Sequence, residues 1–205
     1  MELKYFPKIT VILRGYTYSQ VRTVVKNLIG TSLSSVEITM NSPDAIETIR
    51  KINEEFGHCI LTGAGTVTTY EEAEAVIKAG ARFVLSPIML SQKIIHLCKT
   101  HQVISVPASM TPTEIKTSLD MGADIVKVFP ARTMGPDYFK DIQSPLGKLP
   151  LMAVGGVNGD NVGEYLEAGA SYAGIGSGIF KKEDILSEQE EGIIQSIKYF
   201  EGRLK

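Results

Sequence analysis

The stretch Met121-Gly122-Ala123-Asp124-Ile125-Val126-Lys127-Val128-Phe129-Pro130 joins the end of a predicted helix to a short apolar run. Gly122 stands where the helix would end, because glycine readily adopts the left-handed conformation of a C-cap. The run from Ile125 to Phe129 is rich in β-branched residues, which is typical of a parallel strand covered on both faces. The stretch therefore predicts one unit of an α/β fold, in which a helix leads directly into a buried parallel strand.

The same order recurs along the chain, as in Ala79-Gly80-Ala81 and Ala168-Gly169-Ala170. Eight such apolar runs in 205 residues leave roughly 25 residues per unit, close to the minimum for a closed barrel. We therefore predict an α/β fold, a single-domain (β/α)8 TIM barrel over residues 1–205. An open doubly wound sheet is less favoured, because eight evenly spaced parallel strands close more naturally. The predicted strands are Ile9–Arg14, Val36–Met40, Cys59–Gly65, Phe83–Pro87, Val103–Pro107, Ile125–Phe129, Leu151–Gly156 and Tyr172–Gly178.

The composition, 43% hydrophobic and 21% charged with a net charge of −2, is ordinary for a soluble globular protein. No basic run suggests nucleic acid, no segment approaches the roughly 18 apolar residues of a membrane span, and the first residues lack a signal-peptide layout. Cys59 and Cys98 have no redox or metal spacing, and His58, His96 and His101 are expected on the surface. The sequence thus predicts a cytoplasmic protein without a metal, another cofactor, or a nucleic-acid or membrane partner.

Lys127 interrupts an apolar strand, although lysine is almost never fully buried unless it is paired or used. Alternation along strands directs Lys127 and Phe129 into the barrel, together with Glu37 of the second strand. Arg14 enters the same space from the first strand. A buried amine can become neutral and act as a nucleophile, with a carboxyl group to transfer protons. Two structural interpretations compete: a lysine that reaches solvent from a frayed strand, and a Glu37–Lys127 ion pair that holds the barrel together.

Glycine-rich stretches end the last two predicted strands, Ala153-Val154-Gly155-Gly156-Val157 and Gly174-Ile175-Gly176-Ser177-Gly178. Glycine lets backbone N–H groups approach an anion closely, and phosphate commonly binds at these two strand ends of a barrel. The sequence therefore predicts a phosphate site. Its predicted contacts are Gly155, Gly156, Val157, Gly176 and Ser177.

Other strand ends are expected to line the same mouth. Gly63-Ala64-Gly65-Thr66 lacks the third glycine and the acidic partner of a nucleotide fingerprint. We interpret it as a small, close wall for a substrate, with a hydroxyl group from Thr66. The candidate substrate contacts outside the phosphate site are Arg14, Thr66, Pro87 and Phe129.

Taken in order, these motifs resemble the 2-keto-3-deoxy-6-phosphogluconate and 4-hydroxy-2-oxoglutarate aldolase family over essentially the whole chain. The family implies a class I, Schiff-base aldolase of sugar acid catabolism on a (β/α)8 barrel, usually a homotrimer. Lys127 matches its Schiff-base lysine and Glu37 its proton-transfer glutamate, and Arg14 and Thr66 match substrate contacts. The resemblance is carried by Val11-Ile12-Leu13-Arg14-Gly15, Val36-Glu37-Ile38-Thr39-Met40-Asn41-Ser42-Pro43, Gly63-Ala64-Gly65-Thr66-Val67, Lys127-Val128-Phe129-Pro130-Ala131, Gly135-Pro136 and Ala153-Val154-Gly155-Gly156-Val157.

The resemblance implies cleavage of a 2-dehydro-3-deoxy-6-phospho-aldonate to pyruvate and D-glyceraldehyde 3-phosphate. Asn41-Ser42-Pro43 and Gly135-Pro136 look like the galactonate type, since gluconate-type enzymes typically carry arginine where this chain has Asn41. Pro87-Ile88 and Pro107-Ala108 depart from the family pattern where the substrate carboxylate would bind. The alternatives are a gluconate-type or 4-hydroxy-2-oxoglutarate aldolase, a phosphate-binding barrel isomerase or synthase, and a non-catalytic sugar-phosphate sensor.

Overall fold

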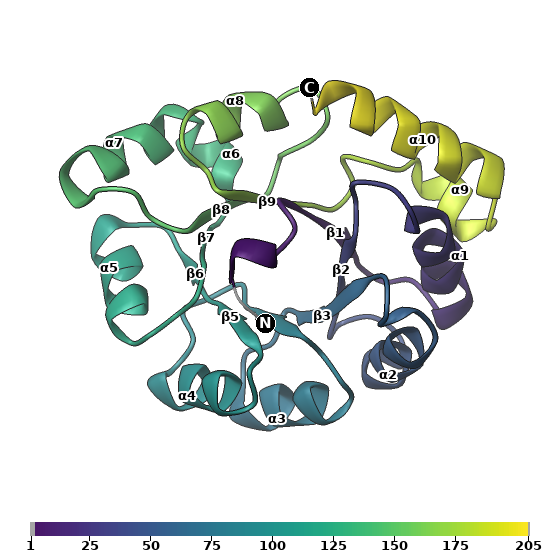
Figure 1. Cartoon of the computed structure of the whole chain (residues 1–205), viewed down its shortest axis with the longest axis horizontal. Coiled ribbons are helices and arrows are strands. Elements are labelled where there is room, and N and C mark those ends of the chain that lie inside the picture. The colour runs from purple at the N-terminus through teal and green to yellow at the C-terminus, as the bar shows by residue number, and fades with distance from the viewer. Residues whose placement is uncertain (1–2, 205) are drawn as a thin grey trace.

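The computed structural model describes residues 3–204. Strands and helices alternate along the chain, and the strands form a ring with the helices outside it (Figure 1). All neighbouring strands pair in parallel, in the order β5-β4-β3-β2-β1-β9-β8-β7-β6. The strands are β1 (Ile9–Leu13), β2 (Ser35–Thr39), β3 (Leu61–Gly65), β4 (Phe83–Leu85), β5 (Ile104–Val106), β6 (Ala108–Ser109), β7 (Val126–Val128), β8 (Leu151–Val154) and β9 (Tyr172–Ile175).

The ring closes where the predicted fifth strand bends at Pro107, which separates β5 from β6. Proline has no N–H group and therefore cannot donate to a strand ladder. Its carbonyl oxygen still accepts from the Lys127 amide at 2.9 Å, and the Ser105 carbonyl accepts from the Ile125 amide at 3.2 Å. β5 and β6 thus share one strand position, so the nine-stranded sheet fills the eight positions that the sequence predicts. The (β/α)8 barrel is confirmed.

Helix boundaries follow the local sequence. Thr111 caps α5, where its hydroxyl accepts from the Glu114 amide at 3.3 Å while the Glu114 carboxylate accepts from the Thr111 amide. Gly122, beyond the end of α5, has a φ of +93°, so the predicted left-handed helix end is confirmed there. The helices are η1 (Leu3–Tyr5), α1 (Tyr18–Leu28), α2 (Ala45–Phe56), α3 (Tyr70–Lys78), α4 (Gln92–Thr100), α5 (Pro112–Asp120), α6 (Ala131–Met134), α7 (Asp137–Leu146), α8 (Val162–Glu167), α9 (Lys182–Leu186) and α10 (Glu190–Arg203). No helix within residues 3–204 is both long and apolar enough to cross a membrane.

A plug of aromatic side chains closes the N-terminal end of the barrel. The buried Phe6 ring packs edge-on against Phe83 and Tyr172, with ring centres 5.3 and 5.4 Å apart. Both partners begin their strands, and η1 lies inside the ring in Figure 1. Side chains such as Ile125 and Met152 fill the interior above the plug. The open end of the barrel is therefore the end where the strands finish.

Candidate active site

Lys127 lies in the middle of β7, inside the barrel. Its strand neighbours Val126 and Val128 pack against the helix layer instead, as the alternation predicts. Glu37 lies in the middle of β2 and is 1% exposed, and Lys127 is 4% exposed. The interpretation of Lys127 as a solvent-reaching lysine is therefore wrong. The barrel interior brings the two predicted catalytic side chains within electrostatic range of each other.

The two groups do not form a direct ion pair. Among residues 3–204, no ion pair joins Glu37 to Lys127, so the structural ion pair considered above is not formed, and Glu37 Oε2 is buried without a hydrogen-bond partner. Burial raises the pKa of Glu37, against the opposing charges of Lys127 and Arg14. Burial lowers the pKa of Lys127, against the opposing charge of Glu37 and with help from Arg14. Both shifts favour the neutral forms, and these are the forms in which an amine can attack a carbonyl carbon and a carboxyl group can donate a proton.

Gly65, the last residue of β3, makes room for the Glu37 carboxyl group. A Cβ atom there would lie 1.6 Å from Glu37 Oε1, whereas a Cβ atom at Gly63 would instead meet the Phe83 ring at 2.3 Å. Gly65 thus bounds the Glu37 carboxyl group, a contact that the sequence interpretation did not include, and the substrate wall at Gly63–Thr66 stays a prediction. The contact between Gly65 and Glu37 follows from the pairing of β2 with β3, and a single sequence does not reveal that pairing.

Arg14, just beyond the end of β1, is held by two side chains from other strand ends. Its Nη1 donates to Asn41 Oδ1 at 2.9 Å and to Thr66 Oγ1 at 3.1 Å. Thr66 has a φ of +61°, a left-handed conformation that costs a β-branched residue on the order of 1–3 kcal/mol. Such strain is typical of functional sites. Sequence reasoning used Asn41 as a marker of type and missed its contact with Arg14.

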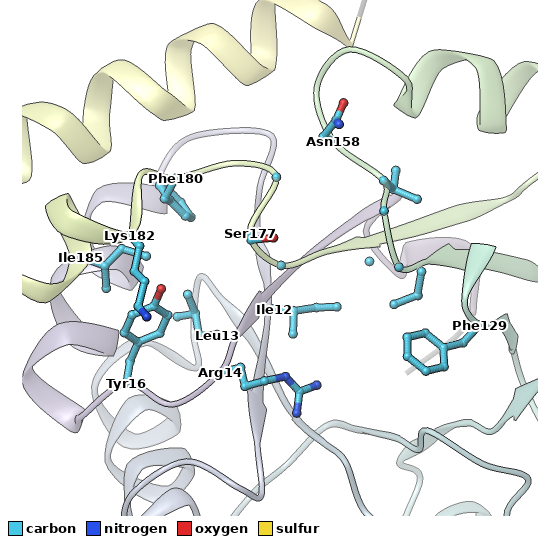
Figure 2. Close-up of a pocket in the computed structure, with 17 residues that line it drawn as sticks. Ile12, Leu13, Arg14, Tyr16, Phe129, Asn158, Ser177, Phe180, Lys182 and Ile185 are labelled. Atoms are coloured by element: carbon cyan, nitrogen blue, oxygen red, sulfur yellow. The ribbon is translucent and has the colours of Figure 1, made fainter. Parts of the chain in front are cut away.

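A cavity of about 540 Å³ opens at the carboxyl ends of β1, β8 and β9 (Figure 2). Lys127 lies behind its wall, with Nζ 4.8 Å from the centre of the Phe129 ring that lines the cavity. Glu37 and Thr66 are also outside the lining. Pro87, which follows β4 on another part of the ring, is outside the lining too, and its contact with the substrate stays a prediction. The predicted residues in the lining are Arg14, Phe129, Gly155, Gly156, Val157, Gly176 and Ser177.

The turn after β8 has a conformation that requires glycine. Gly155 and Gly156 have φ angles of +95° and +84°, and a Cβ atom on Gly156 would lie 2.5 Å from the Arg132 Cβ. Within residues 3–204, the amides of Gly156, Val157 and Ser177 donate no hydrogen bond to a protein acceptor. These N–H groups border the cavity and can therefore donate to an anion.

Cysteine and histidine are remote from this chemistry. His58, His96 and His101 are exposed, and the described residues contain no group of three or more histidine, cysteine, aspartate or glutamate side chains arranged to hold a metal. Cys98 is buried between strand and helices, and burial raises the pKa of its thiol to about 12. It is therefore a poor nucleophile at neutral pH.

Comparison with known proteins identifies the family. A family model described as "KDPG and KHG aldolase" matches residues 2–196. The 2-dehydro-3-deoxy-6-phosphogalactonate aldolase of Escherichia coli (strain K12) is 33% identical over 171 residues, which cover 83% of each chain. A solved structure described as native KDPGal is 27% identical, with a TM-score of 0.83 over 100% of this chain and 99% of that chain.

KDPG aldolase from Legionella pneumophila, solved with pyruvate captured at low pH as a covalent carbinolamine intermediate, is 25% identical. Its TM-score is 0.84, over 93% of this chain and 92% of that chain. The family model spans nearly the whole chain, and the barrel agrees with these solved structures over almost its full length. This chain therefore belongs to the KDPG and KHG aldolase family, and it is an aldolase, a carbon–carbon lyase.

Proposed function

We propose that this aldolase cleaves 2-dehydro-3-deoxy-6-phosphogalactonate to pyruvate and D-glyceraldehyde 3-phosphate through a Schiff base on Lys127. The observation that carries the proposal is the buried Lys127 amine, whose pKa is lowered, within electrostatic range of the Glu37 carboxyl group. The galactonate substrate is the one named for the Escherichia coli relative. The carbinolamine captured in the Legionella pneumophila enzyme is the adduct that precedes an imine.

The reaction begins when the neutral Lys127 amine attacks the C2 carbonyl carbon of the substrate and forms a carbinolamine. Protonated Glu37 gives its proton to the C2 hydroxyl, which leaves as water and yields the iminium ion. The Glu37 carboxylate then takes the proton of the C4 hydroxyl as the C3–C4 bond breaks, and the electron pair of that bond moves to the iminium. D-glyceraldehyde 3-phosphate leaves, Glu37 returns the proton it took to C3 of the pyruvate enamine, and water then hydrolyses the resulting iminium and releases pyruvate from the lysine.

Binding at both ends holds C2 against the lysine. Arg14, fixed by Asn41 and Thr66, presents a cation for the carboxylate beside C2. The amides after β8 and β9 hold the phosphate at the other end of the substrate. Such binding lowers the entropic cost of reaching the reactive geometry.

The test is a coupled assay for pyruvate release from the galactonate substrate and from its gluconate-type C4 epimer. We expect a higher kcat/KM for the galactonate, no cleavage by Lys127→Ala, and a loss of about 10²-fold in kcat for Glu37→Gln. Faster cleavage of the epimer, or of 4-hydroxy-2-oxoglutarate, would move the assignment to those relatives. Wild-type turnover by Lys127→Ala would instead rule out a Schiff base on Lys127 as the route of cleavage.

We also propose a cytoplasmic homotrimer. The support is the usual trimer of the family that the sequence resembles, together with two free cysteines, which fit a reducing compartment. Sedimentation or light scattering of the purified protein tests the oligomeric state. A monomer at micromolar concentration contradicts the proposal.

A further inference from the structure

We propose that Lys182 is a specificity-determining residue, whose ammonium group supplies the cation for the substrate phosphate. The inference rests on the proposed function. Lys182, the first residue of α9, lines the cavity at the side away from Phe129 (Figure 2). Ser177 lies between these two side chains in that view. The amides of the glycine turns are neutral donors. A substrate phosphate bound to them would therefore still need a positively charged partner.

The charges around the cavity divide between two places. Arg14 and Lys182 are the charged side chains among the described residues that line it, and no carboxylate joins them. Arg14 is tied to Asn41 and Thr66 and acts on the pKa of Lys127, so it belongs to the reacting end. The substrate also carries two anions at opposite ends, a carboxylate beside C2 and a phosphate on C6. Lys182 is therefore the cation left for the phosphate.

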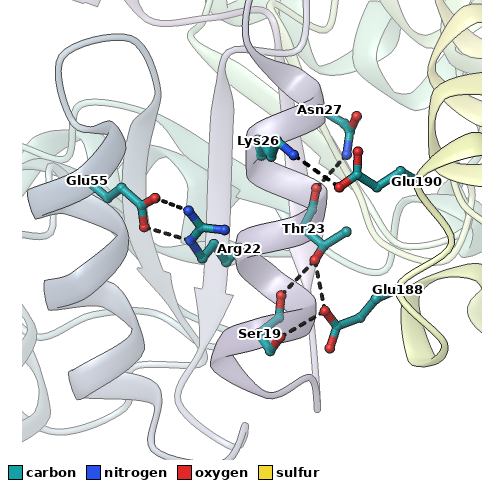
Figure 3. Close-up of polar contacts among 8 residues, drawn as sticks. All are labelled: Ser19, Arg22, Thr23, Lys26, Asn27, Glu55, Glu188 and Glu190. Carbon is teal, nitrogen blue, oxygen red and sulfur yellow. Dashed lines mark hydrogen bonds and ion pairs between the residues drawn. The ribbon is translucent and has the colours of Figure 1, made fainter.

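Lys182 has no competing partner among residues 3–204. It forms no ion pair or hydrogen bond there, whereas other exposed lysines do, such as Lys26 with Glu190 at 3.1 Å (Figure 3). The carboxylate next to it in sequence, Glu183, does not line the cavity. Burial, and after it the charge of Glu183, raises the pKa of the Tyr16 hydroxyl. Tyr16 lines the same side and stays protonated at neutral pH, so it can add a donor.

The backbone that carries Lys182 is fixed by α1. Glu188, two residues beyond α9, accepts from Ser19 Oγ at 2.8 Å and from Thr23 Oγ1 at 3.1 Å (Figure 3). The carbonyl of Leu186 accepts from the side chain of Gln20 at 3.2 Å. The base of the lysine is thus held at the cavity, and its flexible side chain can follow the phosphate.

The experiment compares Lys182→Gln with the matched control Lys181→Gln, since Lys181 is exposed, adjacent and outside the cavity lining. Cleavage is measured with the phosphorylated substrate and with its unphosphorylated analogue. We expect Lys182→Gln to lose about tenfold or more in kcat/KM for the phosphorylated substrate, mainly through KM, the equivalent of ~1.4 kcal/mol. We expect its rate on the unphosphorylated analogue, and both rates of Lys181→Gln, to stay unchanged. Lys182→Arg should retain the preference.

A second readout separates this inference from the proposed function. Calorimetric titration with glycerol 3-phosphate, which has no keto group, should show weaker binding to Lys182→Gln than to the wild type or Lys181→Gln. This result stands whether or not Lys127 forms an imine. Equal binding by both variants, or a loss by Lys182→Gln that is the same for both substrates, overturns the role of Lys182.

Discussion

The barrel interior around Lys127 is an unfavourable place for a charged amine. Burial disfavours the charged amine and lowers its pKa, although the charge of Glu37 opposes the shift, and Arg14 adds repulsion. A position arranged for stability alone would carry an apolar side chain of similar size. The lysine is therefore retained at a cost in stability, as expected of a reactive group.

That cost can be measured. We expect Lys127→Met to raise the free energy of unfolding at neutral pH by about 1 kcal/mol or more. Because the pKa of Lys127 is lowered from 10.5 in the folded chain, the unfolded chain binds more protons between the folded-state pKa and 10.5, so wild-type stability rises with pH there. Urea unfolding of both proteins should show that the difference between their free energies of unfolding shrinks as pH approaches 10.5. A gap that is independent of pH would show that the amine keeps its charge on folding.

A side chain at position 65 is expected to disturb Glu37, because no side chain fits between Gly65 and Glu37 Oε1. Gly65→Ala should displace the Glu37 carboxyl group, lower kcat by about 10²-fold and move the pH profile. In a Glu37→Ala background the same substitution should add little, because the carboxyl group is already absent. Additive losses in the double variant would mean that Gly65 acts on the fold and not through Glu37.

At the scale of elements, strand alternation and glycine helix ends were enough to predict the barrel and the inward direction of Lys127 and Glu37. Local patterns did not predict the break between β5 and β6. A proline interrupts a strand only where the ladder needs a backbone N–H donor at that position, and this depends on the neighbouring strand. They also missed the contact between Gly65 and the Glu37 carboxyl group and the tether of Asn41 to Arg14. Each of these depends on which strands are neighbours, and a single sequence does not contain that pairing.

The turn after β8 gives a prediction of its own. Gly156→Ala would force an L-residue into a φ of +84° and bring its Cβ atom against Arg132, so the turn has to move. We expect KM for the phosphorylated substrate to rise about tenfold or more, while imine formation with pyruvate continues, because pyruvate carries no phosphate. The measurement is steady-state kinetics beside imine trapping. An equal loss of substrate cleavage and of imine formation would show that the substitution disturbs Lys127 instead of the phosphate site.

At the scale of the whole molecule, the barrel separates its stabilising end from its reactive end. The Phe6 plug fills the end where the strands begin, and the cavity opens at the end where they finish. Phe6→Ala should therefore cost about 3 kcal/mol in the free energy of unfolding and leave kcat close to the wild-type value under native conditions. Denaturant unfolding and kinetics on the same preparation test this. A large loss of kcat in a folded variant would couple the two ends.

Schiff-base formation on Lys127 is tested by incubating the protein with pyruvate and borohydride and locating the product by peptide mass spectrometry. We expect a stable reduced adduct on Lys127, present in Glu37→Gln and absent from Lys127→Ala. An unmodified Lys127, or an adduct on a different lysine, contradicts it.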